Sequence, residues 1–244
     1  MTEILKTKKL NVCEESAVDL VLNGKKLVTF MCTPENLNEL AMGHLYNRGL
    51  VKAIDDVYVL SACDEMREIY VTTSDNYSED DYSLAGVLAS GCGSGSVFKE
   101  EFLNREKNSS DLKISLNELK ELSIEMFSNA TKYKETGGMH CASLVYDDKL
   151  LVLREDVGRH NAIDKVIGKG VFLGLNLNNA ILMTTGRISS DMILKAIGAD
   201  IPIVVSRSIP SSLALEIAEK LGITVVGRIV SKEPIVYTHS KRII

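Results

Sequence analysis

The sequence lacks several features that would place it at once in a broad class. No apolar run approaches the roughly 18–20 residues that a membrane-spanning helix needs. The first residues, Met1-Thr-Glu-Ile-Leu-Lys, lack the charged-then-apolar pattern of a secretory signal, so we expect a cytoplasmic protein. A basic excess is also missing, because 28 Lys and Arg face 33 Asp and Glu for a net charge of −5. That balance argues against a general nucleic-acid binder, which must neutralise phosphates.

Paired cysteines are missing as well. The chain has five cysteines at wide spacings and no Cys-x-x-Cys pair: Cys13, Cys32, Cys63, Cys92 and Cys141. Neither a zinc ribbon nor a thioredoxin-type dithiol is therefore indicated, and in a reducing compartment most of these should be free thiols. The 244 residues, 45% hydrophobic and 25% charged, are enough for one large globular domain or two small ones.

The first part of the chain predicts a small α+β unit, to which we assign residues 1–110. Strands at 17–22 and 26–30 flank Asn23-Gly24, a strong hairpin-turn dipeptide. Thr33 is the expected N-cap of a helix that has Pro34 in its first turn and ends near Gly49. Two further strands are expected at 57–60 and 68–73, and the polar stretch 75–82 is expected to be a loop.

The second part, residues 111–244, predicts an α/β domain that follows a polar linker at 106–113. Ser115 should cap a helix that runs to about Ala130, followed by strands at 140–146 and 149–153. Elements then alternate: helix 160–168, strand 180–184, helix 190–198, strand 201–206, helix 211–221, and strands 223–227 and 235–238. Such alternation predicts a largely parallel sheet covered by helices.

The most informative stretch is residues 154–165, Arg-Glu-Asp-Val-Gly-Arg-His-Asn-Ala-Ile-Asp-Lys, in which seven of twelve side chains are ionisable. Apolar residues on both sides place it at a strand-to-helix junction, where α/β proteins bind polar ligands. Arg159, His160 and Asn161 should project from the helix start, whose free N–H groups favour anions. The alternative is a solvated, self-neutralising loop, which is the better explanation for Glu155 or Lys165 taken singly.

Two glycine-rich strings could carry chemistry. Ser90-Gly91-Cys92-Gly93-Ser94-Gly95-Ser96 places one thiol where glycine removes steric cover, so that another macromolecule could reach its sulfur. A phosphate cradle with an incidental cysteine is the alternative, although a Walker loop is not supported. Thr136-Gly137-Gly138-Met139-His140-Cys141-Ala142 has Ala142 where a zinc deaminase needs Glu, so zinc activation of water is not indicated. His140 is as well explained by a hydrogen-bonded core position.

Polar residues also follow two strands of the expected parallel sheet. Thr184-Thr185-Gly186-Arg187 and Ser206-Arg207-Ser208 each lie between a strand and a helix. They should gather at the carboxyl edge of the sheet beside Arg159. Helix capping explains the serines of these segments. It does not explain two arginines in equivalent places, which suit phosphate groups.

Taken together, these strings resemble the formate dehydrogenase accessory sulfurtransferase family, FdhD/NarQ, over nearly the whole chain. The resemblance rests on the following segments: Met31-Cys32-Thr33-Pro34, Gly91-Cys92-Gly93, Thr136-Gly137-Gly138-Met139-His140, residues 154–165, Gly186-Arg187, Pro210-Ser211-Ser212-Leu213-Ala214 and Val236-Tyr237-Thr238-His239.

The resemblance implies a homodimeric sulfur carrier with a cytidine-deaminase-like core sheet and no metal site. It would take persulfide sulfur from a cysteine desulfurase and deliver it to the molybdenum (or tungsten) bis-guanine-dinucleotide cofactor of formate dehydrogenase. Cys92 matches the persulfide cysteine. Many family members have a second cysteine at the position of Gly95. The cofactor-binding segment maps to Arg228, Ile229, Val230, Ser231, Lys232 and Glu233, although it lacks the usual aromatic residue, so binding could shift toward Arg187 and Arg207.

Two other functions remain open from the sequence. The first is a non-catalytic chaperone that binds the pterin cofactor and the apo-enzyme but moves no sulfur. The second is a zinc hydrolase or deaminase on the same fold, for which the residues present supply no ligand set.

Overall fold

The computed structural model describes residues 12–63, 65–75, 77, 87–88 and 104–244. The first of its two mixed sheets contains, in spatial order β3-β4-β1-β2-β5, the strands β1 (Ser16–Leu22), β2 (Lys25–Cys32), β3 (Val57–Cys63), β4 (Glu68–Thr73) and β5 (Val87–Leu88). The second, in the order β11-β10-β9-β8-β6-β7, contains β6 (His140–Tyr146), β7 (Lys149–Asp156), β8 (Ala180–Thr184), β9 (Ile203–Ser206), β10 (Thr224–Gly227) and β11 (Ile235–Thr238).

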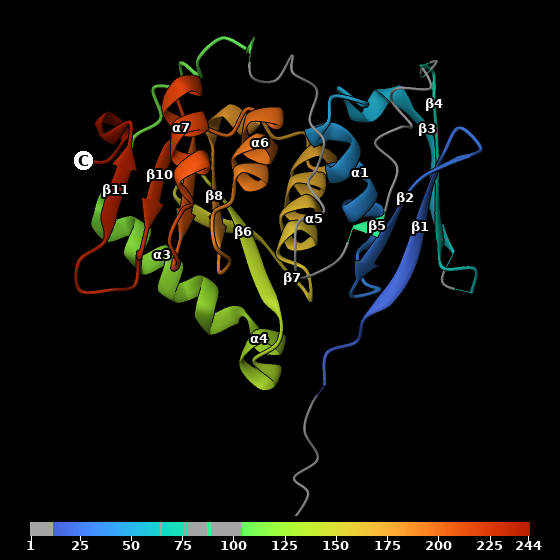
Figure 1. Cartoon of the computed structure of the whole chain (residues 1–244), viewed down its shortest axis with the longest axis horizontal. Helices are drawn as coiled ribbons and strands as arrows, with labels where there is room; N and C mark the ends of the chain where they lie inside the picture. Colours follow the sequence, from blue (N-terminus) through green and yellow to red (C-terminus); the bar gives the residue numbers. More distant parts are fainter. Residues whose placement is uncertain (1–11, 64, 76, 78–86, 89–103) are drawn as a thin grey trace, which may run out of the picture.

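Helices separate and cover the two sheets (Figure 1). Next to the second sheet, α3 (Leu116–Asn129) and α4 (Thr131–Thr136) lie on one face, and α5 (Arg159–Phe172), α6 (Ser190–Gly198) and α7 (Ser212–Leu221) lie on the other. Helix α1 (Leu37–Asn47) lies between α5 and the first sheet. No helix in the described ranges combines the length and the apolar character that crossing a membrane requires.

The N-terminal hairpin forms as predicted, whereas the predicted cap of α1 is wrong. Asn23 and Gly24 adopt φ angles of 49° and 80°, and β1 pairs antiparallel with β2. Helix α1, however, begins only at Leu37, after Asn36 in the left-handed conformation. Thr33 is buried, and its hydroxyl donates to the Glu14 carbonyl (3.2 Å) and accepts from the Val157 N–H (3.2 Å). The hydroxyl thus joins distant strand ends instead of capping the helix.

The second sheet is mixed, not largely parallel. Strands β8, β9 and β10 are parallel, but β6 runs antiparallel to β7 and β8, and β11 runs antiparallel to β10. The reason is the length of the connections. Asp147 and Asp148, both at positive φ, turn β6 directly into β7, and two residues cannot carry a parallel crossover.

Helix α4 was not expected from the sequence, because the pattern predicted one helix that ends near Ala130.

Alternation along the strands places side chains in two hydrophobic clusters. In β8, Ile181 and Met183 pack in the cluster that contains Met126 of α3, while Leu182 packs in the cluster on the α5 face. The cluster on the α5 face, which contains Leu182, also includes residues of β1, β2 and α1. The two sheets therefore share one hydrophobic core.

The expected linker at 106–113 is also packed. It contains no helix or strand, but Arg242 donates to the carbonyls of Ser110 (3.0 Å) and Asn108 (2.9 Å). Hydrogen bonds to a buried arginine hold this segment on the second half of the chain, so it does not behave as a free connection.

Helices α1 and α5 cross at backbone contact distance, which requires glycine on both. A Cβ on Gly43 would lie 1.8 Å from the Asp164 carbonyl oxygen, and one on Gly168 would lie 1.9 Å from the Glu39 carbonyl oxygen. Neither position has room for a larger residue unless the helices separate. This contact holds the first sheet and its helix against the second.

Candidate functional site

One edge of the second sheet collects residues from five strands. Strands β8, β9 and β10 are parallel, and β7 runs in the same direction because β6 is antiparallel to both β7 and β8. The ends of these four strands and the start of β6 therefore meet at one edge. We call it the arginine edge, after the residues that follow the four strand ends: Arg159, Arg187, Arg207 and Arg228.

Two neighbouring cavities open along this edge. One, of about 370 Å³, is lined by Arg159, Arg187, Ile188, Ser189, Ile209, Pro210 and Ser211. The other, of about 330 Å³, is lined by Tyr133, Gly137, Gly138, Met139, His140, Thr185, Arg207 and Ser208. Thr185 and Arg187, two residues apart, face different cavities. The structure therefore divides the residues expected at the cofactor pocket between two adjacent hollows.

Short hydrogen bonds fix the strand ends at the edge. The Ser206 hydroxyl donates to the Gly186 carbonyl (2.6 Å) and accepts from the Ser208 N–H (2.9 Å), which ties the end of β8 to the end of β9. A side chain on Gly186 would meet Arg159 Cβ at 3.1 Å. Glycine at this position thus lets the start of α5 lie against the end of β8.

Arg207 is held in place by aromatic neighbours. Its Nη1 donates to the Tyr133 hydroxyl (2.5 Å), and its guanidinium lies 5.4 Å from the ring centre of Phe127. The arginine is exposed nonetheless. The contacts orient the guanidinium and leave some of its five N–H donors for a ligand. The sequence did not point to Tyr133, because it lies in α4, the helix that the pattern missed.

Both histidines at the edge are held neutral. Burial lowers the pKa of His140, and the positive charges of Arg159 and Arg187 lower it further. Burial likewise lowers the pKa of His160 to about 3, assisted by Lys195 and Arg159. The Nε2 of His160 lies 3.9 Å from Asp191 Oδ2. At neutral pH the positive charge of this edge therefore comes from arginine.

Part of the ionisable stretch is structural. Lys165 is fully buried, and its Nζ donates to Asp156 Oδ2 (2.5 Å) and to the Thr33 carbonyl (2.9 Å). The Asn161 amide donates to Asp156 Oδ1 (3.1 Å) and to the Met31 carbonyl (2.8 Å). We call these four side chains, Thr33, Asp156, Asn161 and Lys165, the junction clamp, because they join the end of β2 to the start of α5.

The remaining charges of the stretch also have partners. Arg154 forms a two-pronged pair with Glu39 of α1 (2.5 and 2.8 Å), and Asp164 pairs with Lys195 (2.6 Å). The Glu155 carboxylate accepts from the Tyr133 N–H at the start of α4 (2.6 Å). The interpretation of Glu155 and Lys165 as solvated charges was wrong. Of the three residues expected at the helix start, Asn161 is committed to the clamp, and Arg159 lines a cavity.

Residues 228–233 connect β10 to β11 beside the arginine edge. The Arg228 N–H donates to the Ser208 carbonyl (2.9 Å), and the Ile229 N–H donates to the Ser206 carbonyl (3.2 Å). Ile229 is buried in the hydrophobic core, and Ser231 is half-buried. The other side chains expected to meet a ligand are exposed: Arg228, Val230, Lys232 and Glu233.

Cys92 lies outside the described residues. The last described residue before it is Leu88, which pairs with Phe30 of β2. The next residue of β2, Met31, accepts the hydrogen bond from Asn161, two residues after Arg159. The backbone of Leu88 therefore lies near the start of α5.

The other thiols differ in access. Cys141 is fully buried, and burial raises its pKa, so it is a poor partner for thiol exchange. Burial also raises the pKa of Cys32, to about 12. Cys13 is half-buried, and its sulfur would lie 2.9 Å from a Cβ on Gly138, which lines the second cavity. Sequence spacing gave no sign that Cys13 would lie there. In the described part of the chain, no group of three or more His, Cys, Asp or Glu could hold a metal ion.

Comparisons with known proteins identify relatives of similar length. The chain is 34% identical over 233 residues to the sulfur carrier protein FdhD of Bacillus subtilis (strain 168), covering 94% of this chain and 88% of that protein. It is 33% identical over 234 residues to sulfur carrier protein FdhD of Wolinella succinogenes, with coverages of 95% and 82%.

A solved structure has a similar fold. The crystal structure of a formate dehydrogenase accessory protein from Desulfotalea psychrophila superposes with a TM-score of 0.78 at 29% identity, covering 95% of this chain and 90% of that one. The model of the FdhD/NarQ family matches residues 13–244. The chain therefore belongs to the FdhD/NarQ family.

Proposed function

We propose that the protein is a sulfur carrier for formate dehydrogenase. It would accept persulfide sulfur from a cysteine desulfurase on Cys92 and pass it to the molybdenum (or tungsten) bis-guanine-dinucleotide cofactor of that enzyme, which is its substrate. The observation that carries the proposal is the arginine edge of the second sheet, with its two cavities. Relatives named sulfur carrier protein FdhD support the sulfur-transfer part.

The arginine edge suits a substrate rich in phosphate. Within the described residues, the side chains of Arg187 and Arg228 form no hydrogen bond or ion pair, so their donors remain for a ligand. Helix α5 begins at Arg159 without a side-chain cap, and a helix start favours anions. Each cavity is at the small end of ligand pockets, so each would take one part of a bis-dinucleotide.

The transfer itself needs one accessible sulfur. The Cys92 thiolate attacks the outer sulfur of the desulfurase persulfide, the S–S bond of that persulfide breaks, and the desulfurase cysteine leaves as a thiolate. Cys92 then carries the outer sulfur to the substrate. Cys92 follows Leu88 by four positions, so their Cα atoms are at most about 14 Å apart. This reach is consistent with presentation of the sulfur near the start of α5.

The test is sulfur loading followed by mass spectrometry. After incubation with a cysteine desulfurase and cysteine, the wild type should gain an adduct of about 32 Da on Cys92, the mass of one sulfur atom on the thiol ladder. Cys92→Ser should gain none and should fold normally. Cys63→Ser removes a half-buried thiol elsewhere and should load like the wild type. Sulfur delivery by Cys92→Ser at the wild-type level would reject the proposal.

One observation keeps a chaperone function in view. Gly95 stands where many family members have a second cysteine, and the buried Cys141 cannot replace that thiol. A protein that binds the cofactor and the apo-enzyme but moves no sulfur would show guanine-nucleotide binding at the arginine edge and no adduct on Cys92. The two functions are therefore separated by the same experiment.

We also propose the finer organisation that the resemblance implies. Residues 111–244 would form the cytidine-deaminase-like domain and residues 1–110 the smaller unit that carries Cys92. The described strands divide accordingly, with the first sheet drawn from residues 16–88 and the second from residues 140–238. The protein would act as a cytoplasmic homodimer, and size-exclusion chromatography with light scattering tests the dimer.

A further inference from the structure

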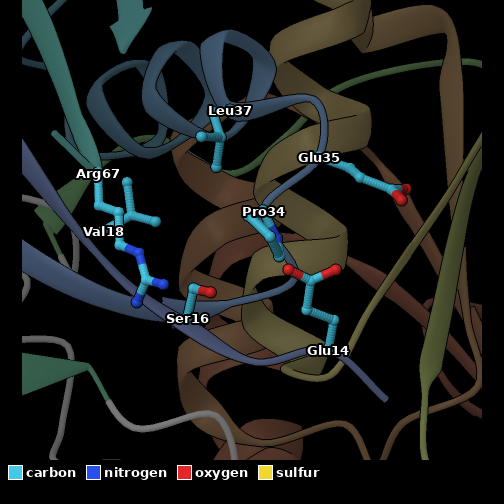
Figure 2. A pocket seen from close by; sticks show the side chains of 7 residues that line it. All are labelled: Glu14, Ser16, Val18, Pro34, Glu35, Leu37 and Arg67. Carbon is cyan, nitrogen blue, oxygen red and sulfur yellow. The ribbon is translucent and has the colours of Figure 1, made fainter. Parts of the chain in front are cut away.

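A third cavity lies away from the arginine edge. It has a volume of about 330 Å³ and is bounded by the start of β1, the segment before α1 and the turn between β3 and β4. Figure 2 shows its lining: Glu14, Ser16, Val18, Pro34, Glu35, Leu37 and Arg67. We infer that this cavity binds a free α-amino acid, whose ammonium and carboxylate groups meet opposite charges on its walls.

The charges of the lining match a zwitterion. Arg67 and Glu14 lie on opposite sides of the cavity, with the Ser16 hydroxyl between them (Figure 2). Neither the Arg67 nor the Glu14 side chain forms an ion pair or hydrogen bond with another described residue. The second carboxylate, Glu35, points away in Figure 2 and already pairs with Lys132. One cation and one anion thus remain uncommitted in one small space.

The rest of the lining is apolar and firmly held. Val18 and Leu37 are buried in the main core, and Pro34 completes this wall. Such a wall suits a short apolar side chain. The volume is at the small end of ligand pockets, which accommodates a free amino acid.

The backbone at Arg67 is unusual. Its φ of 52° lies in the left-handed region, which an arginine adopts at a cost in free energy. Its carbonyl accepts from the Asp19 N–H (2.9 Å), which fixes this turn against β1. The neighbouring strand thus holds the Arg67 backbone in place at the wall of the cavity.

Calorimetry with three matched probes tests the inference: L-valine, isobutylamine, which lacks the carboxylate, and isovalerate, which lacks the ammonium group. We expect saturable binding of L-valine and at least about tenfold weaker binding of each analogue, since loss of one charge-assisted contact is worth about 1.4 kcal/mol or more. Absence of saturable L-valine binding, or equal binding of all three probes, would overturn the inference.

Variants locate the site. Arg67→Gln should lower the affinity for L-valine at least about tenfold and leave the affinity for isobutylamine unchanged. Glu14→Gln should lower the affinity for L-valine and leave the affinity for isovalerate unchanged. Lys149→Gln and Glu121→Gln, both exposed and distant from the cavity lining, should bind like the wild type. If L-valine affinity is unaffected by both cavity variants, the assignment is wrong. Sulfur loading of Cys92 is measured separately, so either proposal can fail without the other.

Discussion

Lys165 and Arg187 belong to neighbouring parts of the molecule, but one is wholly buried and the other is exposed. The Lys165 ammonium is surrounded by the Asp156 carboxylate and the Thr33 carbonyl, in the junction clamp. The Arg187 guanidinium lines an open cavity and has no side-chain partner within the described residues. Buried charge must be paired, whereas exposed charge remains available for a ligand. The dense charges of this region therefore divide into a structural set and a binding set.

Removal of the clamp cation should have the largest effect. Lys165→Met leaves the Asp156 carboxylate buried without its cation, and breaking a buried pair in this way costs about 3–5 kcal/mol of unfolding free energy. Urea unfolding followed by circular dichroism measures the loss. Lys149→Met, at an exposed lysine, should change stability by less than about 0.5 kcal/mol. Similar values for both variants would show that the clamp does not stabilise the fold.

Removal of an edge cation should change binding and leave stability intact. GDP serves as a soluble probe for the guanine-nucleotide ends of the cofactor. Arg187→Gln should weaken the binding of GDP by about 1.5–3 kcal/mol, since one charge-assisted contact is lost. Its urea midpoint should stay at the wild-type value. Fluorescence titration with labelled GDP gives the affinity. If Arg187→Gln unfolds more easily but binds GDP normally, the division into two sets is wrong at this residue.

A methyl group at the helix crossing tests the shared core. Alanine usually stabilises a helix relative to glycine, but a Cβ on Gly168 would lie 1.9 Å from the Glu39 carbonyl oxygen. Gly168→Ala should therefore lose about 1–3 kcal/mol of unfolding free energy because α1 and α5 must separate. Thermal and urea unfolding show whether the free energy of unfolding falls or rises in this variant. A stabilised variant would mean that the crossing tolerates separation.

Acid should also destabilise the fold through His44, a buried histidine of α1. Burial, with a contribution from Arg48, lowers the pKa of His44 to about 3, below the 6.5 of an unperturbed histidine. The stability that neutral His44 contributes is therefore fully present above pH 6.5 and decreases as the pH falls toward 3. The slope is about 1.4 kcal/mol per pH unit for one proton. His44→Gln should show a shallower decline between about pH 6.5 and 5 in urea titrations; an unchanged slope would contradict the assignment.

The local elements were largely predictable because their signals are short-range. The strands at 180–184 and 235–238 and the helix at 190–198 have the predicted bounds, and Ser115 caps α3 as predicted. Its side chain also exchanges hydrogen bonds with Glu118, which was not predicted from the sequence. What failed depends on distant partners. Thr33 is a residue type that commonly caps helices, but its hydroxyl forms hydrogen bonds with Glu14 and Val157 instead. Val157 lies 124 residues after Thr33 in the chain.

The candidate site shows the same limit. The ionisable stretch was recognisable as a junction, but its division between clamp and edge was not, because burial of Lys165 depends on the end of β2. Nothing in the sequence indicated that Tyr133 and Cys13 lie at the candidate site. Their positions beside the second cavity depend on how α4 and the N-terminal segment pack against Gly138 and Arg207.

Contact between the backbones of α1 and α5 has a consequence for how the molecule can move. Since Gly43 and Gly168 leave no slack between the helices, a hinge at this boundary would break close packing along the whole crossing. The two sheets should therefore move as one rigid body. If Cys92 carries sulfur as proposed, its approach to the substrate would then require no movement of α1 against α5, and stiffening the crossing further should leave transfer rates unaltered.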